Sequence, residues 1–406
     1  MCRGFFVNFT LRIIPMKKLF LFPALCFSLL FYAQTFTQAY QNRVDDISQI
    51  NINKNLTDFA TFGVKTTGSA SNNNTFAWLK SKYLEFGYTE AQLSENAFSY
   101  SGNTTKNLIL TKTGTTYPNT FVIICGHYDT IVGPGVNDNG SGTAVILEMA
   151  RILKDVPTEY SIKFINFTGE EQGLRGSQNY VSTVVNGTTP KMNIKLVFNI
   201  DQVGGVAGEV NNTVTCERDT NNSPSANNAA SNTVTQELMN CVALYSPLQT
   251  KLANAYGSDY MPFQSNGEII TGFYEANESS KPHSAGDTFA NMDPLFVYNV
   301  AKAALGAVQH FTVASTTVLA VTDCPPEKML ESLKIYPNPT ADFVNIDMLN
   351  TNLKNYTFTV SDFNGRVLSK TQNQKRIDVS KLASGIYLGM MTVEDQKVTK
   401  KIMIKK

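Results

Sequence analysis

Three apolar segments of the chain run directly into residues that can bind a metal. The segments are 121–125, 162–167 and 196–200, and the polar residues that follow them are His127, Asp129, Glu170, Glu171 and Asp201. If these segments are strands of one parallel sheet, their carboxyl ends meet at one edge, where such sheets bind ligands. Imidazole and carboxylate groups are ligands that zinc favours. The pattern therefore predicts a metal site at this edge.

Two loops add one candidate ligand each. Asp138 lies in Val-Asn-Asp-Asn-Gly-Ser-Gly, where Gly140 and Gly142 allow a tight turn that brings the carboxylate inward. His283 lies in Lys-Pro-His-Ser-Ala-Gly-Asp and is one of only 3 histidines in the chain. His310 lies in an apolar helical stretch, and we expect it to be structural.

Together these side chains could hold two zinc ions. Two ions about 3.5–4 Å apart need a bridging group, and a carboxylate can bridge them. If each ion takes one His and one carboxylate, and the two ions share a further carboxylate, Glu170 is not needed as a ligand. A free carboxylate beside a metal-bound water can act as a general base. Asp129, two residues after His127, could accept the second imidazole N–H and fix the tautomer.

Each motif alone also has an ordinary structural explanation. A histidine at a strand end is often structural, adjacent glutamates are often a solvated pair, and Asp-Asn-Gly is a common turn. A metal site accounts for all of them together, because they gather at one edge of one predicted sheet.

The elements that must position these residues alternate along the chain. Helical patterns at about 75–86, 141–153 and 174–184 stand before or between the apolar strands. This alternation predicts an α/β fold with a mainly parallel mixed sheet and helices on both faces. Residues 211–233, rich in Asn, Thr, Ser and Ala, are expected to form an exposed loop.

The chain divides into four predicted segments. Residues 1–33 are a leader, 34–314 the domain with the metal site, 315–333 a linker, and 334–406 a small all-β sandwich domain. In the last segment Asn364-Gly365, between short alternating runs, is a hairpin signal.

The leader has the features of an export signal. Lys17-Lys18 precede an apolar run, Leu19 to Ala33, that is too short for a typical membrane span. We expect cleavage near Ala33, with Met16 a possible true start, and no stable membrane anchor; a retained anchor is the alternative. The protein would then be secreted or displayed on the cell surface.

The charge of the middle of the chain argues against one class of partner. Residues 34–330 carry more acidic than basic side chains, which argues against nucleic acid as a partner.

The cysteines are too sparse for a disulfide scaffold. Cys125, in an apolar run, is expected to be a buried thiol. Cys216 and Cys241 could pair after export, and a pairing and two free thiols both remain open.

The motifs resemble those of the zinc aminopeptidase family that includes secreted bacterial leucyl aminopeptidases, glutamate carboxypeptidase and the glutaminyl cyclases. The resemblance covers about residues 60–312. It rests on segments in matching order and approximate spacing: His127-Tyr128-Asp129-Thr130, Asp138-Asn139-Gly140-Ser141-Gly142, Gly169-Glu170-Glu171-Gln172-Gly173, Asn199-Ile200-Asp201 and His283 with Asp287-Thr288. Any one of these motifs alone would be weak.

The resemblance implies a zinc exopeptidase fold and a role for each site residue. Asp138 would bridge two Zn²⁺ ions, with His127 and Asp201 on one ion and Glu171 and His283 on the other. In the same scheme, Glu170 is the general base and Asp129 orients His127. Two departures concern the substrate side: Tyr260 stands where the family commonly has His, and Pro282-His283-Ser284 where it often has Tyr-His-Thr.

The C-terminal segment resembles a second family, the sorting domains of type IX secretion cargo. The resemblance rests on Ile335-Tyr336-Pro337-Asn338-Pro339-Thr340, Asn364-Gly365-Arg366-Val367, Ser384-Gly385-Ile386-Tyr387 and the final Lys400 to Lys406. It implies a partner in the secretion machinery. A carbohydrate-binding or spacer sandwich is the structural alternative.

The function that these resemblances imply is hydrolysis of N-terminal residues from peptides with a free N-terminus, in an exported enzyme. Three alternatives stay open. A carboxypeptidase would need a cationic clamp, for which Arg175 or Arg218 is a candidate, and a glutaminyl cyclase would need only one zinc. A non-catalytic displayed binding module would have no use for Glu170.

Overall fold

The computed structural model of the protein describes residues 34–220, 222–317, 333–347, 356–362, 365–393 and 396–406. The predicted leader, most of the predicted linker, Cys324 and Asn364 lie outside these residues.

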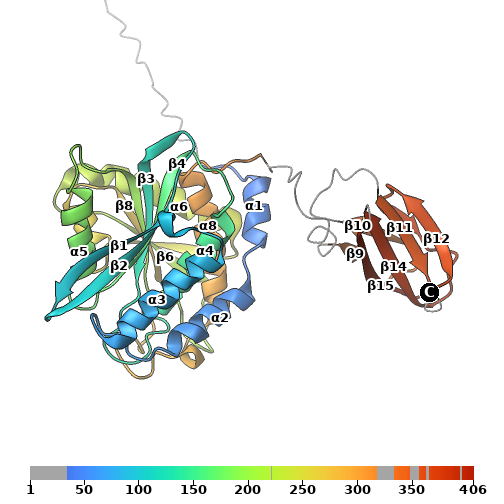
Figure 1. Cartoon of the computed structure of the whole chain (residues 1–406), viewed down its shortest axis with the longest axis horizontal. Helices are drawn as coiled ribbons and strands as arrows, with labels where there is room; N and C mark the ends of the chain where they lie inside the picture. Colours follow the sequence, from blue (N-terminus) through green and yellow to red (C-terminus); the bar gives the residue numbers. More distant parts are fainter. Residues whose placement is uncertain (1–33, 221, 318–332, 348–355, 363–364, 394–395) are drawn as a thin grey trace, which may run out of the picture.

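An eight-stranded sheet forms the centre of the first unit, in the order β1-β2-β4-β3-β5-β8-β6-β7 (Figure 1). The strands are β1 (Leu93–Tyr100), β2 (Asn103–Lys112), β3 (Tyr117–His127), β4 (Tyr160–Phe167), β5 (Asn193–Ile200), β6 (Thr213–Arg218), β7 (Gln249–Asn254) and β8 (Ile270–Glu275). Strands β4, β3, β5 and β8 are parallel, β2 pairs antiparallel with β4, and β1 pairs antiparallel with β2. Strand β6 runs antiparallel to β8 and parallel to β7. The predicted mixed sheet with a parallel centre is therefore confirmed, and β3, β4 and β5 are the three predicted strands.

Helices cover both faces of this sheet, as predicted. One face packs against α1 (Gln38–Asp45), α2 (Gln49–Ala60), α3 (Ala70–Glu85), α4 (Gly140–Leu153), α6 (Asn228–Tyr245) and α8 (Pro294–Phe311). The other face packs against α5 (Arg175–Tyr180), the π-helical turn Val181–Val185 and α7 (Met261–Ser265). Side chains alternate between the faces along each strand: Val122 and Ile124 of β3 face the first group of helices, and Ile123 and Cys125 the second.

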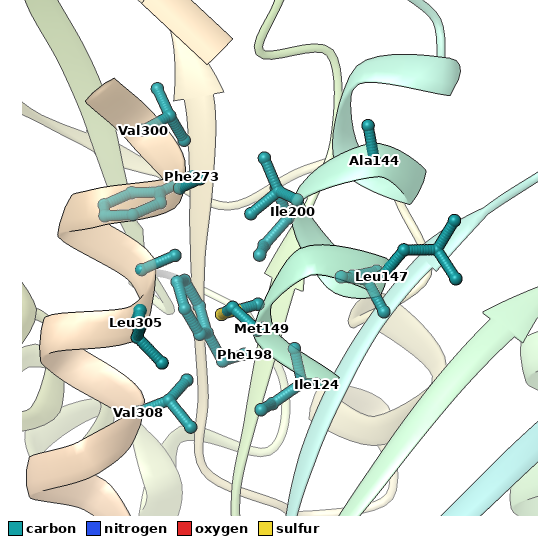
Figure 2. Packing of buried hydrophobic residues seen from close by; sticks show 14 of the residues in the cluster. Ile124, Ala144, Leu147, Met149, Phe198, Ile200, Phe273, Val300, Leu305 and Val308 are labelled. Carbon is teal, nitrogen blue, oxygen red and sulfur yellow. The ribbon is translucent and has the colours of Figure 1, made fainter. Parts of the chain in front are cut away.

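The larger core fixes the strand ends that carry the site. Figure 2 shows side chains of β3, β5 and β8 meeting those of α4 and α8: Ile124, Phe198, Ile200, Phe273, Leu147, Met149, Leu305 and Val308. All of these are fully buried, and each such side chain contributes about 1.5–3 kcal/mol relative to exposure.

One sequence expectation for this unit is wrong. The predicted loop at 211–233 contains β6 and the start of α6. Its Asn and Ser residues suggested a loop, but the β-branched run Thr213-Val214-Thr215 forms a buried strand. The sequence left Cys216 and Cys241 open between a disulfide and two free thiols, and the disulfide is not formed. Both are free thiols that pack in the core as small apolar side chains, one on β6 and one on α6.

The second unit is all-β, as predicted. Its sheets comprise β9 (Lys334–Tyr336), β10 (Phe343–Asp347) and β13 (Arg376–Asp378), and β11 (Tyr356–Ser361), β12 (Val367–Gln372), β14 (Gly385–Val393) and β15 (Gln396–Ile404). Strands β11 and β12 pair antiparallel around the Asn364-Gly365 signal, which confirms the predicted hairpin. Val344 and Phe358, from different sheets, share one small core. No helix in the described parts of the chain is both long and apolar enough to cross a bilayer.

Candidate metal centre

The seven predicted site residues come from four connections, those after β3, β4, β5 and β8. His127 is the last residue of β3, Glu170 and Glu171 follow β4, and Asp201 follows β5 directly, so the parallel centre brings them to one edge. The remaining three are Asp129 after β3, Asp138 before α4 and His283 after β8.

Two groups of possible ligands meet at Asp138. In the first, the His127 Nε2 atom lies 3.2 Å from Asp138 Oδ1 and 3.2 Å from Asp201 Oδ1. In the second, His283 Nε2 lies 3.2 Å from Asp138 Oδ2 and 2.9 Å from Glu171 Oε2. The two oxygens of one carboxylate thus face two different ligand groups.

Glu170 stands beside these groups without belonging to either. Its Oε2 atom lies 3.9 Å from His127 Nε2. Its side chain and the members of both ligand groups line one cavity of about 600 Å³. Burial raises the pKa of Glu170 to about 10 and that of Glu171 to about 8, and a neighbouring carboxylate adds to the effect in each case. Hydrogen bonds to His127 and His283 offset the burial of Asp138 and hold its pKa below its ordinary value.

The donor set therefore fits divalent cations. Each group offers one imidazole nitrogen and two carboxylate oxygens, the ligand types that zinc prefers, and three protein ligands leave a position for water. The buried carboxylates outnumber the imidazoles, and an excess of buried negative charge is costly unless cations offset it. Two cations sharing Asp138 would provide that compensation.

The loop of Asp138 is held from both sides by side-chain hydrogen bonds. The Asp287 carboxylate accepts from the backbone N–H of Asn137 at 2.7 Å and of Asp138 at 3.0 Å. Asn139 caps α4 by accepting from Gly142 N–H at 2.9 Å and donates to the Ile200 carbonyl at 2.9 Å. The loop of Asp138 is thus tied to the end of β5, directly before Asp201.

Asp129 contacts His127 through an atom other than the predicted one. The His127 Nδ1 atom lies 3.2 Å from the backbone carbonyl of Asp129 but 3.7 Å from its carboxylate, which is too long for a hydrogen bond. The carboxylate instead accepts from the backbone N–H groups of Glu170 and Glu171, both at 3.3 Å, and from Thr67 at 3.2 Å. It therefore positions the two-glutamate loop.

We predict that Asp129→Asn lowers activity or metal affinity by about 10–100-fold, the usual effect of losing a group that orients ligands. An amide has one acceptor oxygen, so its NH₂ group would face one of the two backbone N–H donors of Glu170 and Glu171. Metal titration and steady-state kinetics of the variant measure the effect. Wild-type affinity and rate would show that this carboxylate does not hold the loop.

Sequence reasoning missed two contributors to the site. Ser258 donates to the Asp201 Oδ2 atom and accepts from Asn199 at 2.8 Å, so it fixes the orientation of that ligand. Glu217, on β6, lines the cavity although its segment was expected to be an exposed loop. An acidic residue shortly after the β-branched run of β6 is the sequence signal that could have revealed it. His310, expected to be structural, lies on α8, 2.9 Å from the Tyr245 hydroxyl.

This arrangement is typical of a metal-dependent hydrolase, in which paired cation sites stand beside a spare carboxylate. Residues 107–308 match peptidase family M28, and residues 334–405 match the secretion system C-terminal sorting domain. The chain thus carries an M28 peptidase domain followed by a sorting domain, in agreement with both resemblances seen in the sequence.

Individual relatives agree with this assignment. The chain is 42% identical over 118 residues to aminopeptidase YwaD of Bacillus subtilis, covering 28% of this chain and 25% of that protein. It is 30% identical over 194 residues to a probable zinc metalloprotease of Pyrenophora teres f. teres, covering 41% and 39%. It therefore spans well under half the length of these curated relatives. LapB from Legionella pneumophila shares the fold, with a TM-score of 0.60 and 19% identity over 70% of this chain and 78% of LapB.

Proposed function

We propose that this protein is an exported aminopeptidase that uses two zinc ions to remove N-terminal residues from peptides. The observation that carries the proposal is the position of Asp138, whose two carboxylate oxygens each lie 3.2 Å from the Nε2 atom of a different histidine. The names of the relatives, an aminopeptidase and a probable zinc metalloprotease, support the same class and metal.

The residues divide into ligands and a base. His127 and Asp201 would hold one ion, Glu171 and His283 the other, and Asp138 both. Bound zinc would polarise the scissile carbonyl and lower the pKa of a water molecule.

Glu170 would carry the proton. Its carboxylate takes a proton from the attacking water and delivers it to the nitrogen of the leaving amine, so that the C–N bond breaks. The products are a free amino acid and a peptide shortened by one residue. The position of Glu170 outside both ligand groups, yet within 3.9 Å of His127 Nε2, supports this role.

The charge of the cavity favours recognition of an amine. No Lys or Arg side chain of the described residues lines it. Of the two candidates for a carboxylate clamp, Arg175 donates to the Gln172 carbonyl and Arg218 to Asn232, and neither lines the cavity. A carboxypeptidase is therefore disfavoured. A shared carboxylate disfavours the one-zinc cyclase, and a binding module has no use for Glu170.

A zinc count combined with an aminoacyl chromogen assay tests the proposal. The purified full chain should hold two zinc ions, cleave leucine or lysine p-nitroanilide, and leave the N-acetylated form of that substrate intact because it lacks a free amine. Cleavage of C-terminal residues, a single zinc ion with cyclisation of N-terminal glutamine, or zinc binding without hydrolysis would each contradict it.

We further propose that the sorting domain directs export and that neither end remains in the mature enzyme. The expected secreted form runs from about Gln34 to a site between 315 and 335. Intact-mass measurement on culture supernatant checks this. Recovery of only the full-length chain inside the cells would contradict it.

A further inference from the structure

The cavity continues beyond the metal centre to a second acidic side chain, Glu217. This residue lies on β6, is 4% exposed and lines the cavity wall. In the register of the sheet Glu217 stands opposite Gly272 of β8, which in turn stands opposite Asn199 of β5. Glu217 is thus two strand spacings, about 10 Å, from the end of β5 that leads to Asp201. A substrate residue bound at the metal centre could reach it with a long side chain.

Glu217 is held in place by a tyrosine. The Tyr260 hydroxyl donates to Glu217 Oε2 at 2.7 Å, and the backbone N–H of Tyr256 donates to the same hydroxyl at 3.1 Å. Gly272 leaves room for this pair, since a Cβ atom there would lie 2.7 Å from the Tyr260 ring and 3.1 Å from Glu217 Oε2. Tyr260 is also the position at which the sequence departs from the common His of the resembling family. The tyrosine that departs from the family pattern is therefore the residue that holds the buried Glu217 carboxylate.

The Glu217 carboxylate retains capacity for a ligand. Among the described residues its side chain accepts a hydrogen bond from Tyr260 alone, whereas a carboxylate has about four acceptor sites. Burial raises the pKa of Glu217 to about 8. A buried carboxyl group with one partner is costly, and a cation brought by the substrate would offset that cost.

The walls between the metal centre and Glu217 suit the stem of a long cationic side chain. Tyr256 and Tyr274 line the cavity, and a Lys or Arg stem packs well along aromatic surface while its charged end reaches a polar partner. The second acid of the wall outside the metal centre, Glu278, is exposed and accepts from the Tyr274 hydroxyl at 3.0 Å. A deep acid behind tyrosine walls is a poor receptor for an apolar side chain.

We propose, on the basis of the aminopeptidase function above, that Glu217 is a specificity-determining residue that selects peptides with N-terminal lysine or arginine. The α-amine and the scissile carbonyl lie at the metal centre, and the ammonium or guanidinium group of the first side chain pairs with the Glu217 oxygen that Tyr260 leaves open. Tyr260 orients that carboxylate from the other side.

The test compares p-nitroanilides of lysine, arginine and norleucine, because norleucine keeps the lysine stem without its charge. With the zinc-loaded full chain we expect kcat/KM for lysine to exceed that for norleucine by at least about tenfold. In Glu217→Gln the ratio should fall by about 10–100-fold, mainly through KM for lysine, while the norleucine substrate loses far less. Glu268→Gln is the matched control, a buried glutamate that pairs with Lys191 outside the cavity, and it should keep the wild-type ratio.

Three results would overturn the inference. Equal wild-type kcat/KM for lysine and norleucine does so without any variant, even if Glu217→Gln does not fold. An equal loss on all substrates in Glu217→Gln would assign the residue a structural role and leave the aminopeptidase proposal intact. If the zinc-loaded wild type cleaved none of the three substrates, the proposed aminopeptidase function would be contradicted, and so would the specificity proposal that rests on it.

Discussion

Glu170→Gln is expected to bind zinc like the wild type and to lose about 10²–10⁴-fold in kcat, the usual share of general-base catalysis. Glutamine keeps the shape and hydrogen-bonding capacity of the side chain but cannot take a proton from water. Glu170 belongs to neither ligand group, so its neutralisation removes no ligand. Zinc per chain and kcat on the p-nitroanilide that the wild type cleaves fastest are the two measurements.

The neighbouring residue provides the matched comparison. Glu171 lies 2.9 Å from His283 Nε2 and belongs to a ligand group, so Glu171→Ala should lose zinc as well as rate. The two variants alter adjacent carboxylates in one loop, which makes the relation between metal content and rate decisive. Loss of zinc in Glu170→Gln with both ions retained in Glu171→Ala would reverse the two roles. Wild-type rates in both variants would exclude catalysis at this site.

The sequence could predict that the site residues lie close together, because parallel strands bring the residues that follow them to one edge of the sheet. The ligand-type residues after β3, β4 and β5 follow apolar runs, and parallel strands place their carboxyl ends together. The position of His283 depends instead on the loop after β8, and its backbone has a φ of 55°, in the left-handed region that few non-glycine residues adopt. Apolar periodicity gives no signal for such a backbone conformation.

What sequence reasoning missed depends on contacts between segments far apart in the chain. The sequence places Asp129 near His127, but whether its carbonyl or its carboxylate faces the imidazole depends on the path of the loop that contains Glu170. Glu217 becomes part of the cavity only because β6 pairs with β8. The pairing of Cys216 and Cys241 could not be decided from the sequence, because spacing says nothing of whether two thiols face each other across a helix–strand contact.

Asp138→Ala is expected to reduce zinc content at both positions and to abolish measurable hydrolysis, whereas His283→Ala should lose about one zinc ion. Asp138 offers one oxygen to each ligand group, so its removal leaves both groups with one histidine and one carboxylate. His283 belongs to one group only, and the other keeps all three members. Metal content by atomic spectroscopy after removal of loose zinc, with kcat/KM on the same samples, distinguishes the two variants.

His310→Ala is the matched control for the histidine variant. His310 lies on α8 against the Tyr245 hydroxyl and the Tyr40 ring, outside the cavity, so its loss should lower stability without changing zinc content. A shared carboxylate requires the zinc loss in Asp138→Ala to exceed that in His283→Ala, because one change affects two sites and the other affects one. If Asp138→Ala lost no more zinc than His283→Ala, Asp138 would serve a single ion. The two-zinc mechanism would then lack its bridge, and Glu170 would have to act beside one ion.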